Sequence, residues 1–144
     1  MFFKFYEKYP SLDISQVFCA RIDPEIRLSS ELLKSFYYLL WFPGYFGFNW
    51  DALNDCLCDF SWIDNKKIAI IHEKIPELPD EEKVIYLDIL SHAILSWKED
   101  NTHDFDVYFK QEDKKISKSC LRLQGIIKSQ KDNSNMPKPS PFQL

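Results

Sequence analysis

The sequence predicts an α/β fold, with a small three-stranded parallel sheet packed with helices in the order β-α-α-β-α-β. Residues 67–72 contain the apolar run Ile-Ala-Ile-Ile, which is typical of a strand buried on both faces of a helix-covered sheet. Segments with strand patterns alternate with segments of helical spacing, so helical crossovers are expected between the strands. At 144 residues and 45% hydrophobic composition, the chain is long enough for one domain with a core.

The first strand is predicted over residues 15–22, and Asp23-Pro24 ends it because proline has no N–H to donate to a sheet. Ser29 or Ser30 is then expected to cap a helix that runs to about Leu40. Apolar residues at helical spacing are expected to form its buried face: Leu32, Leu33, Phe36, Tyr37 and Leu40.

A second helix is predicted from Asn49 to Phe60, after a loop over residues 43–48. Asn49 is a good N-cap, and Leu53, Cys56 and Leu57 recur on one apolar face. After the buried strand at 67–72, Asp80 is expected to cap a long helix to about Trp97. Its apolar stripe comprises Tyr86, Ile89, Leu90, Ala93, Ile94 and Trp97. Alternating Phe105, Val107 and Phe109 place the third strand over 105–110.

The chain divides into a central domain over residues 15–110 and two extensions. Residues 1–14 form the N-terminal extension, where Phe3, Phe5 and Tyr9 are compatible with an extra edge strand. Residues 111–144 form a basic C-terminal extension, whose last dozen residues are expected to be disordered. Within it, the apolar residues of 120–123 and 126–127 are compatible with one more packed element.

Charge is unevenly distributed along the chain. Residues 1–109 hold 10 Lys and Arg against 19 Asp and Glu, whereas residues 110–144 hold 8 against 3. An acidic body argues against direct nucleic-acid binding, which needs a basic face to neutralise phosphates. It favours a basic protein partner. The basic tail is expected to be solvated; the alternatives are contact with the RNA of a partner or closure over the acidic face.

The four cysteines form no C-x-x-C pair, and no histidine lies at metal-ligand spacing from them, so no metal site or cofactor is expected. The first eight residues carry charges where a signal peptide needs an apolar core. No run of 18 apolar residues is long enough to span a membrane. We therefore expect a cytoplasmic protein with reduced thiols and no membrane contact.

Residues 42–57 carry the main functional signal, because an aromatic loop leads directly into a helix with regularly spaced acids. Asp51, Asp55 and Asp59 lie at i, i+4 and i+8, so they are expected on one side of that helix. Like charges at this spacing destabilise a helix by a few tenths of a kcal/mol per pair, that is, by about 0.2–0.5 kcal/mol. Such repulsion is understandable if a cationic partner docks on this side.

This segment closely resembles the signature of the barstar family, small intracellular inhibitors of ribonucleases. The family pattern is Pro-x-Tyr-aromatic-Gly, then Asn-x-Asp-Ala-Leu, then one variable residue before Asp-Cys-Leu. Eleven positions match in register: Pro43, Tyr45, Phe46, Gly47, Asn49, Asp51, Ala52, Leu53, Asp55, Cys56 and Leu57. The close resemblance covers about residues 30–62, and a looser match in element order extends it to about residue 110.

The resemblance implies that the protein blocks the active site of a basic ribonuclease, as a 1:1 complex, and catalyses nothing. Asp55 would pair with the phosphate-binding cations, Asp51 would reinforce it, and Tyr45 would pack on an active-site side chain. The expected partner-binding residues are Tyr45, Gly47, Asn49, Trp50, Asp51, Asn54, Asp55 and Asp59. The natural role would be that of an immunity protein against a bacterial ribonuclease toxin, secreted or delivered by cell contact, as in toxin–antitoxin pairs.

Several positions depart from the family pattern. The variable residue is an aromatic in the best-known inhibitor and is Asn54 here, while Phe48 and Trp50 add aromatic side chains to the loop and helix. No acid in 85–97 can be aligned with the one that the family can supply from its long helix. These departures indicate a different partner more than a different binding mode.

Other interpretations of these residues remain open. Asp51 and Asp55 resemble a general acid–base pair, but no histidine, nucleophile or glycine-rich phosphate loop supports catalysis. A barstar-like module for a basic partner that is not a nuclease is the main alternative. Tyr45 and Trp50 could instead anchor the loop in the core. Gly47 is expected to adopt positive φ, and Cys56 to act as a small buried hydrophobe.

Overall fold

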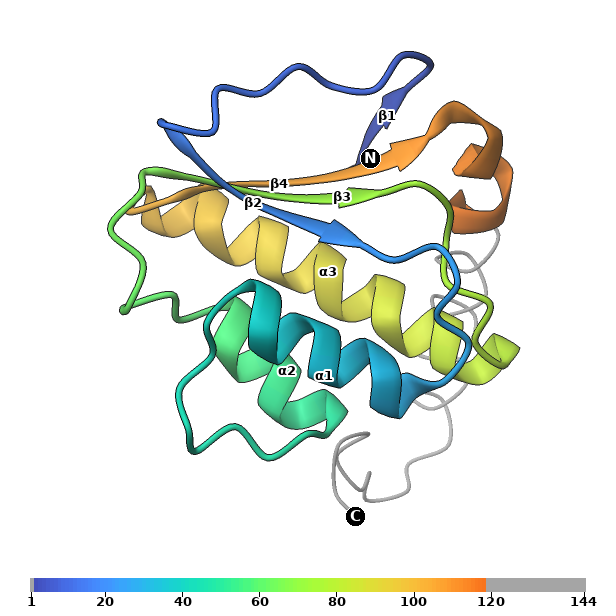
Figure 1. The fold of residues 1–144 in the computed structure, drawn as a ribbon, viewed down its shortest axis with the longest axis horizontal. Helices are drawn as coiled ribbons and strands as arrows, with labels where there is room; N and C mark the ends of the chain where they lie inside the picture. Colours follow the sequence, from blue (N-terminus) through green and yellow to red (C-terminus); the bar gives the residue numbers. More distant parts are fainter. Residues whose placement is uncertain (1, 119–144) are drawn as a thin grey trace, which may run out of the picture.

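The structure, a computed structural model, describes residues 2–118 and consists of a four-stranded parallel sheet covered on one face by three helices (Figure 1). The strand order is β1-β4-β3-β2. The elements are β1 (Lys4–Tyr6), β2 (Val17–Ile22), α1 (Ser29–Leu39), α2 (Trp50–Leu57), β3 (Lys67–His72), α3 (Asp80–Asp100), β4 (Asp104–Lys110) and the 3-10 turn η1 (Gln111–Asp113). The predicted α/β class and the order of its three main strands are confirmed.

β3 lies in the interior of the sheet, as its apolar run predicts. Ile68 and Ile70 belong to the core beneath the helices. Ala69 and Ile71 alternate with them and therefore face the other side of the sheet, yet both are almost fully buried. The strand is thus buried on both faces, which requires a second layer over the face that the helices leave open.

The N-terminal segment provides that layer and an additional edge strand. β1 pairs in parallel with β4, and the rings of Phe3 and Phe5 lie 5.0 and 6.5 Å from that of Phe109. Residues 7–16 then pass over the face of the sheet opposite the helices (Figure 1). The Tyr9 ring lies 5.7 Å from the guanidinium of Arg21 there. The extra strand predicted near Phe3 and Phe5 is present, so the sheet has four strands instead of three.

Two predicted helix caps are wrong. α1 has Leu28 at its N-cap, and α3 has Pro79; neither helix has a side-chain capping hydrogen bond. Ser29 and Asp80 are instead the first helical residues. In each helix an acid lies in the first turn, where the positive end of the helix dipole favours it: Glu31 in α1, and Asp80, Glu81 and Glu82 in α3.

Two tryptophans stabilise the C-terminal ends of the shorter helices. The last carbonyl groups of a helix lack partners within the helix and need other donors. The indole N–H of Trp62 donates to the carbonyl of Leu40 over 2.8 Å, and that of Trp97 donates to the carbonyl of Leu57 over 2.7 Å. Because Trp97 belongs to α3, its bond also holds the end of α2 against the longest helix.

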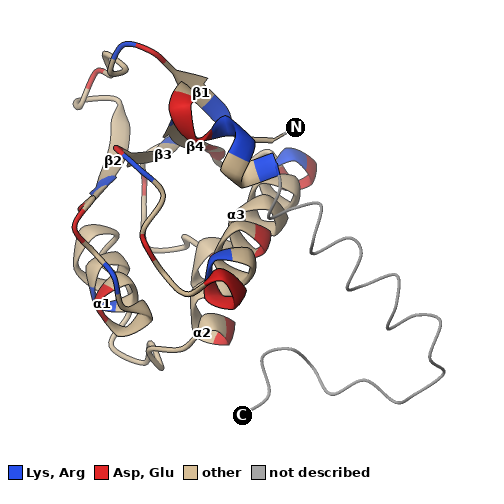
Figure 2. Cartoon of the chain, turned by 90° about the vertical axis from the view of Figure 1, so that its right-hand side faces the viewer, with Lys and Arg blue, Asp and Glu red and all other residues tan. Residues whose placement is uncertain are grey.

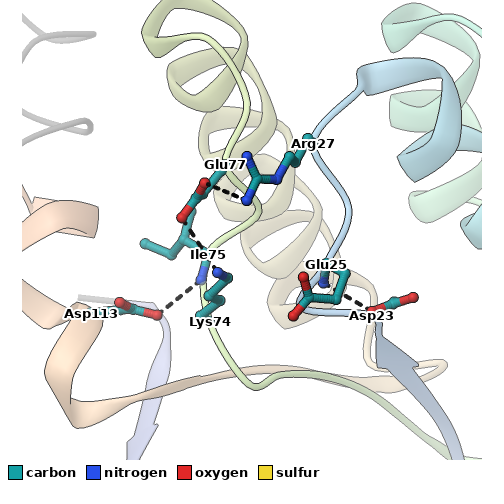
Figure 3. Close-up of polar contacts among 7 residues, drawn as sticks. All are labelled: Asp23, Glu25, Arg27, Lys74, Ile75, Glu77 and Asp113. Atoms are coloured by element: carbon teal, nitrogen blue, oxygen red, sulfur yellow. Dashed lines mark hydrogen bonds and ion pairs between the residues drawn. The ribbon is translucent and has the colours of Figure 1, made fainter.

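The loops at the carboxyl ends of the strands are linked by polar contacts (Figure 3). Glu77 forms ion pairs with Lys74 at 3.3 Å and with Arg27 at 3.8 Å. The second pair joins the loop after β3 to the loop after β2. Asp113 accepts the backbone N–H of Ile75 over 2.9 Å, which brings the segment after β4 to the same place. This edge of a parallel sheet often carries a ligand site, but here these charged groups bind each other.

His72 ends β3 inside a buried hydrogen-bond network. Its Nδ1 lies 3.0 Å from the carbonyl oxygen of Tyr108, which can only accept, so Nδ1 carries the hydrogen. Its Nε2 lies 2.5 Å from the hydroxyl of Tyr86, which therefore donates. Burial lowers the pKa of His72 to about 3, although the bond to the Tyr108 carbonyl opposes the shift. Burial also raises the pKa of Tyr86, so both groups are neutral at pH 7.

The apolar stretches predicted at 120–123 and 126–127, and the disordered last dozen residues, lie outside the described residues.

The buried neutral His72 should make the protein acid-sensitive. Its pKa is about 3 when folded against 6.5 as the ordinary value, so between these pH values the unfolded chain binds a proton that the folded protein does not. The contribution of His72 to the free energy of unfolding should be constant above pH 6.5. It should fall as the pH drops toward 3, by up to about 1.4 kcal/mol per pH unit.

Urea denaturation of wild type and His72→Gln between pH 7 and pH 4 measures this effect. We expect the wild type to lose more stability than the variant over this range, since glutamine does not titrate. Equal pH dependence in the two proteins would contradict the role of His72.

Candidate functional site

The loop between α1 and α2 is held by two buried aromatic residues. The rings of Phe42 and Phe46 lie 4.9 Å apart, and Phe42 lies 5.8 Å from the ring of Trp62. A turn closes between them, with the N–H of Phe46 donating to the carbonyl of Pro43 over 3.0 Å. Tyr45 lies in this turn and is 75% exposed. The interpretation of Tyr45 as a core anchor of the loop is therefore wrong, because Phe42 and Phe46 have that role.

Gly47 does not have the positive φ that was predicted; the left-handed residue is its neighbour Phe48, with φ of 51°. Gly47 is needed for another reason. A Cβ atom there would lie 3.2 Å from Nδ2 of Asn49 and 3.8 Å from Cβ of Ala52. Glycine thus lets the loop approach the start of α2 closely, and the Asn49 amide donates to its carbonyl over 3.4 Å.

Asn49 starts α2 as its N-cap, as predicted. Its Oδ1 accepts the backbone N–H of Ala52 over 2.7 Å. The helix ends at Leu57 and not at Phe60, because Phe60 takes a left-handed φ of 48° and packs its ring 5.8 Å from that of Trp97. Asp59 therefore lies beyond the end of α2, and only Asp51 and Asp55 of the three predicted acids are on the helix itself.

Asp51, Asp55 and Asp59 are nevertheless all exposed, while Leu53 and Leu57 of α2 are fully buried. We call these three aspartates the acidic face. Desolvation and the negative charges of Asp59 and Asp55 raise the pKa of Tyr45, so its phenol lies in the field of these two carboxylates. Figure 2 shows acidic residues on α2 and on turns of the adjacent α3, whereas basic residues gather around the segment after β4. The structure thus brings Tyr45, Asp55 and Asp59 together.

Trp50 and Asn54 lie at the border between α2 and α3. The Trp50 ring is half-buried, 6.3 Å from that of Tyr86, which fits the interpretation of Trp50 as an anchor. Oδ1 of Asn54 lies 3.0 Å from Nδ1 of His92, which donates because an amide oxygen can only accept. Sγ of Cys58 lies 3.8 Å from the same nitrogen. Neither Trp50 nor Asn54 projects as freely as the three aspartates.

Cys56 is a small buried hydrophobe, as predicted, with 3% of its surface exposed. Burial, together with the charges of Asp59 and Asp55, raises its pKa to about 11. Its thiol is therefore protonated at neutral pH and unsuited to nucleophilic chemistry.

Sequence reasoning missed several residues around this site. Tyr38 and Trp41 are 73% and 75% exposed. Helical spacing could have placed Tyr38 off the buried face of α1. His92 could not be found, since its contact with Asn54 joins two helices far apart in the sequence. Asp88 lies one turn before His92 on α3 and is half-buried.

Within residues 2–118, no group of three or more His, Cys, Asp or Glu side chains is arranged to hold a metal ion. The helices of this part of the chain are all too short or too polar to cross a membrane. The site offers three exposed carboxylates, Asp51, Asp55 and Asp59, and the exposed phenol of Tyr45.

Removal of the α2 cap should destabilise the fold. Asn49→Ala leaves the N–H of Ala52 without its partner, and such caps contribute about 1 kcal/mol. We expect the free energy of unfolding in urea to fall by about that amount, with Asn49→Asp retaining most of it because a carboxylate also accepts. An unchanged midpoint for Asn49→Ala would show that the cap is not needed.

Two comparisons bear on the identity of the chain. No curated protein matches it. The family model described as Barstar (barnase inhibitor) matches residues 17–110, from the start of β2 to the end of β4, which is more than half of the chain. The helices and the loop described above, with the acidic face, lie within this match. The protein belongs to the barstar family.

Proposed function

We propose that this protein inhibits a ribonuclease by inserting the acidic face of α2 into its active site. The family model describes inhibitors of the ribonuclease barnase, so an inhibitory role is the first expectation for a member. The observation that supports it most is the position of Asp51 and Asp55, both exposed on a helix whose other side is buried.

Ribonuclease active sites bind phosphates with cationic side chains, which carboxylates can engage in place of the substrate. Asp55 pairs with the cations at the centre of the site, and Asp51 reinforces it. Tyr45, which is exposed and lies in the field of Asp55 and Asp59, packs on an active-site side chain. Inhibition then needs no catalytic step by this protein, because substrate and inhibitor occupy the same positions.

The proposal extends to the biological role. We infer a 1:1 complex with a basic ribonuclease toxin, neutralised in the cytoplasm of the cell that makes the inhibitor. The aromatic loop and Asn54 differ from the family pattern, which supports a partner with a differently shaped rim. No cofactor takes part.

The double variant Asp51→Asn/Asp55→Asn tests the site. We expect it to fold like the wild type, since both side chains are exposed, and to lose inhibition. Truncating one carboxylate of a buried charge pair costs about 2–5 kcal/mol in known complexes, the barnase–barstar complex among them, or a factor of roughly 30 or more in affinity.

The assay measures cleavage of a fluorogenic RNA by barnase, and by any basic ribonuclease that the tagged protein retains from its native cells. Glu7→Gln/Glu112→Gln removes the same charge from two exposed positions off α2 and is the matched control. Equal inhibition by both double variants would remove the acidic face from the mechanism. A retained basic protein without ribonuclease activity would favour the alternative of a general interaction module.

Salt dependence provides a second test of the electrostatic mechanism. The association rate constant with the ribonuclease should fall by at least tenfold between about 0.05 and 0.5 M NaCl, because ions screen long-range attraction. Stopped-flow experiments measure the association and dissociation rate constants. The salt effect should appear mainly in the association rate constant and less in the dissociation rate constant. An association rate that does not change with salt would contradict steering by the acidic face.

A further inference from the structure

Four large aromatic side chains are exposed around the loop that precedes α2. Tyr38, Trp41 and Tyr45 are each more than 70% exposed, and Phe48 is 45% exposed. We call these four residues the aromatic surface. Tyr37 links two of them, because its ring lies 5.1 Å from that of Tyr38 and 5.1 Å from that of Phe48. Exposure of so many large rings in one segment costs solvation and indicates a surface used for binding.

The backbone of this segment provides an independent observation. Trp41 and Phe48 have φ of 55° and 51°, in the left-handed region that bulky side chains rarely adopt. Glycine or asparagine would fit these positions with less strain. Exposure means that Trp41 contributes little to the core in return. The left-handed φ of Trp41 ends α1, because it lets the N–H of Phe42 donate to the carbonyl of Tyr37 over 3.1 Å. Glycine or asparagine is usual at this position of a helix end, so an exposed tryptophan there is unusual.

The surroundings of the aromatic surface indicate which side chains it would bind. From Ser35 to Asn65 the sequence contains four aspartates and no Lys, Arg or His. The described cation–π contacts of the protein involve Lys4, Arg21, Lys98 and Lys114, all with rings outside this surface. None of its rings takes part in the cation–π contacts described within residues 2–118, and Tyr45 lies in the field of Asp55 and Asp59.

We propose that the aromatic surface binds arginine side chains on the rim of the basic partner, as a second contact region beside the acidic face. The inference rests on the proposed function, since it takes the partner to be basic. Guanidinium groups stack on aromatic rings and pair with carboxylates at the same time, whereas the lysine ammonium is a strongly hydrated point charge. The partner would thus be recognised by arginine content as well as by its total charge.

Hexa-arginine and hexalysine peptides test this directly, because they carry the same charge. Titration followed by ¹H–¹⁵N NMR should show tighter binding of hexa-arginine, with shifts of the Trp41 indole N–H. In Trp41→Gly, the dissociation constant for hexa-arginine should rise at least threefold, and the preference over hexalysine should disappear. The melting temperature of this variant should equal or exceed that of the wild type, because glycine relieves the left-handed φ.

Asn101→Gly is the matched control, since it also places glycine at a positive φ, 66°, but at the end of α3. It should leave both affinities unchanged. Tyr38→Ser, which alters an exposed ring on regular helix, should weaken hexa-arginine alone and serves if Trp41→Gly is unstable. Equal affinity of the wild type for the two peptides, or a preserved preference in both ring variants, would overturn the proposal.

The acidic double variant Asp51→Asn/Asp55→Asn separates this proposal from the proposed function. It should weaken both peptides by similar factors and keep the preference for arginine. Arginine preference together with failure to inhibit any ribonuclease would remove the proposed function and leave the aromatic surface. If the acidic variant loses inhibition and the wild type shows no preference for arginine, the proposed function stands and the proposal for the aromatic surface falls.

Discussion

Parallel pairing of β2, β3 and β4 in chain order is the constraint on which the rest of the structure depends. Parallel strands need crossover connections, and these are right-handed in nearly all proteins. Two successive crossovers in the same direction across the sheet place their helices on the same face, as Figure 1 shows. α2 must then share that face with α1 and α3, so one side of it is buried and the other is left to solvent.

α2 has only eight residues, which is too short for a stable helix in isolation. Contacts at both ends compensate for this. The Asn49 side chain accepts an N–H at the start, and the Trp97 indole donates to the Leu57 carbonyl at the end. Trp50, Asn54 and Leu57 meet Tyr86, His92 and Trp97 in the same order along α3, so the two helices run in the same direction. The carboxylates of Asp51 and Asp55 are therefore carried on a fixed scaffold, which lowers the entropic cost of binding.

Features with local causes could be predicted from the sequence, and features with tertiary causes could not. The run Ile68–Ile71 indicates a strand buried on both faces whatever covers it, and the Asn49 cap needs only residues three positions away. The exact starts of α1 and α3 were missed because several polar residues follow one another there. The end of α2 depends on Phe60 packing against Trp97, far along the chain. The left-handed φ lies on Phe48 and not on Gly47, against ordinary residue preference.

For the charges of the candidate site, too, the features with local causes could be predicted and those with tertiary causes could not. Aspartates at helical spacing predicted an exposed acidic side, and Asp51 and Asp55 lie on it. Asp59 joins them from beyond the helix, and the proximity of Tyr45 to Asp59 follows from how the loop folds back. The contact between Asn54 and His92 has no local signal, since it requires α2 and α3 to be already side by side.

The position of β1 has a consequence for folding during synthesis. Among the strands of residues 2–118, β1 is synthesised first and its partner β4 last, and Lys4 pairs with Tyr108. Phe3 and Phe5 therefore lack their packing partner Phe109 on the nascent chain until almost all the described residues are synthesised. During that time the far edge of β3 is open as well, because β4 also covers it. The sheet closes in a late step, and the chain is most prone to mispairing with other nascent chains just before it.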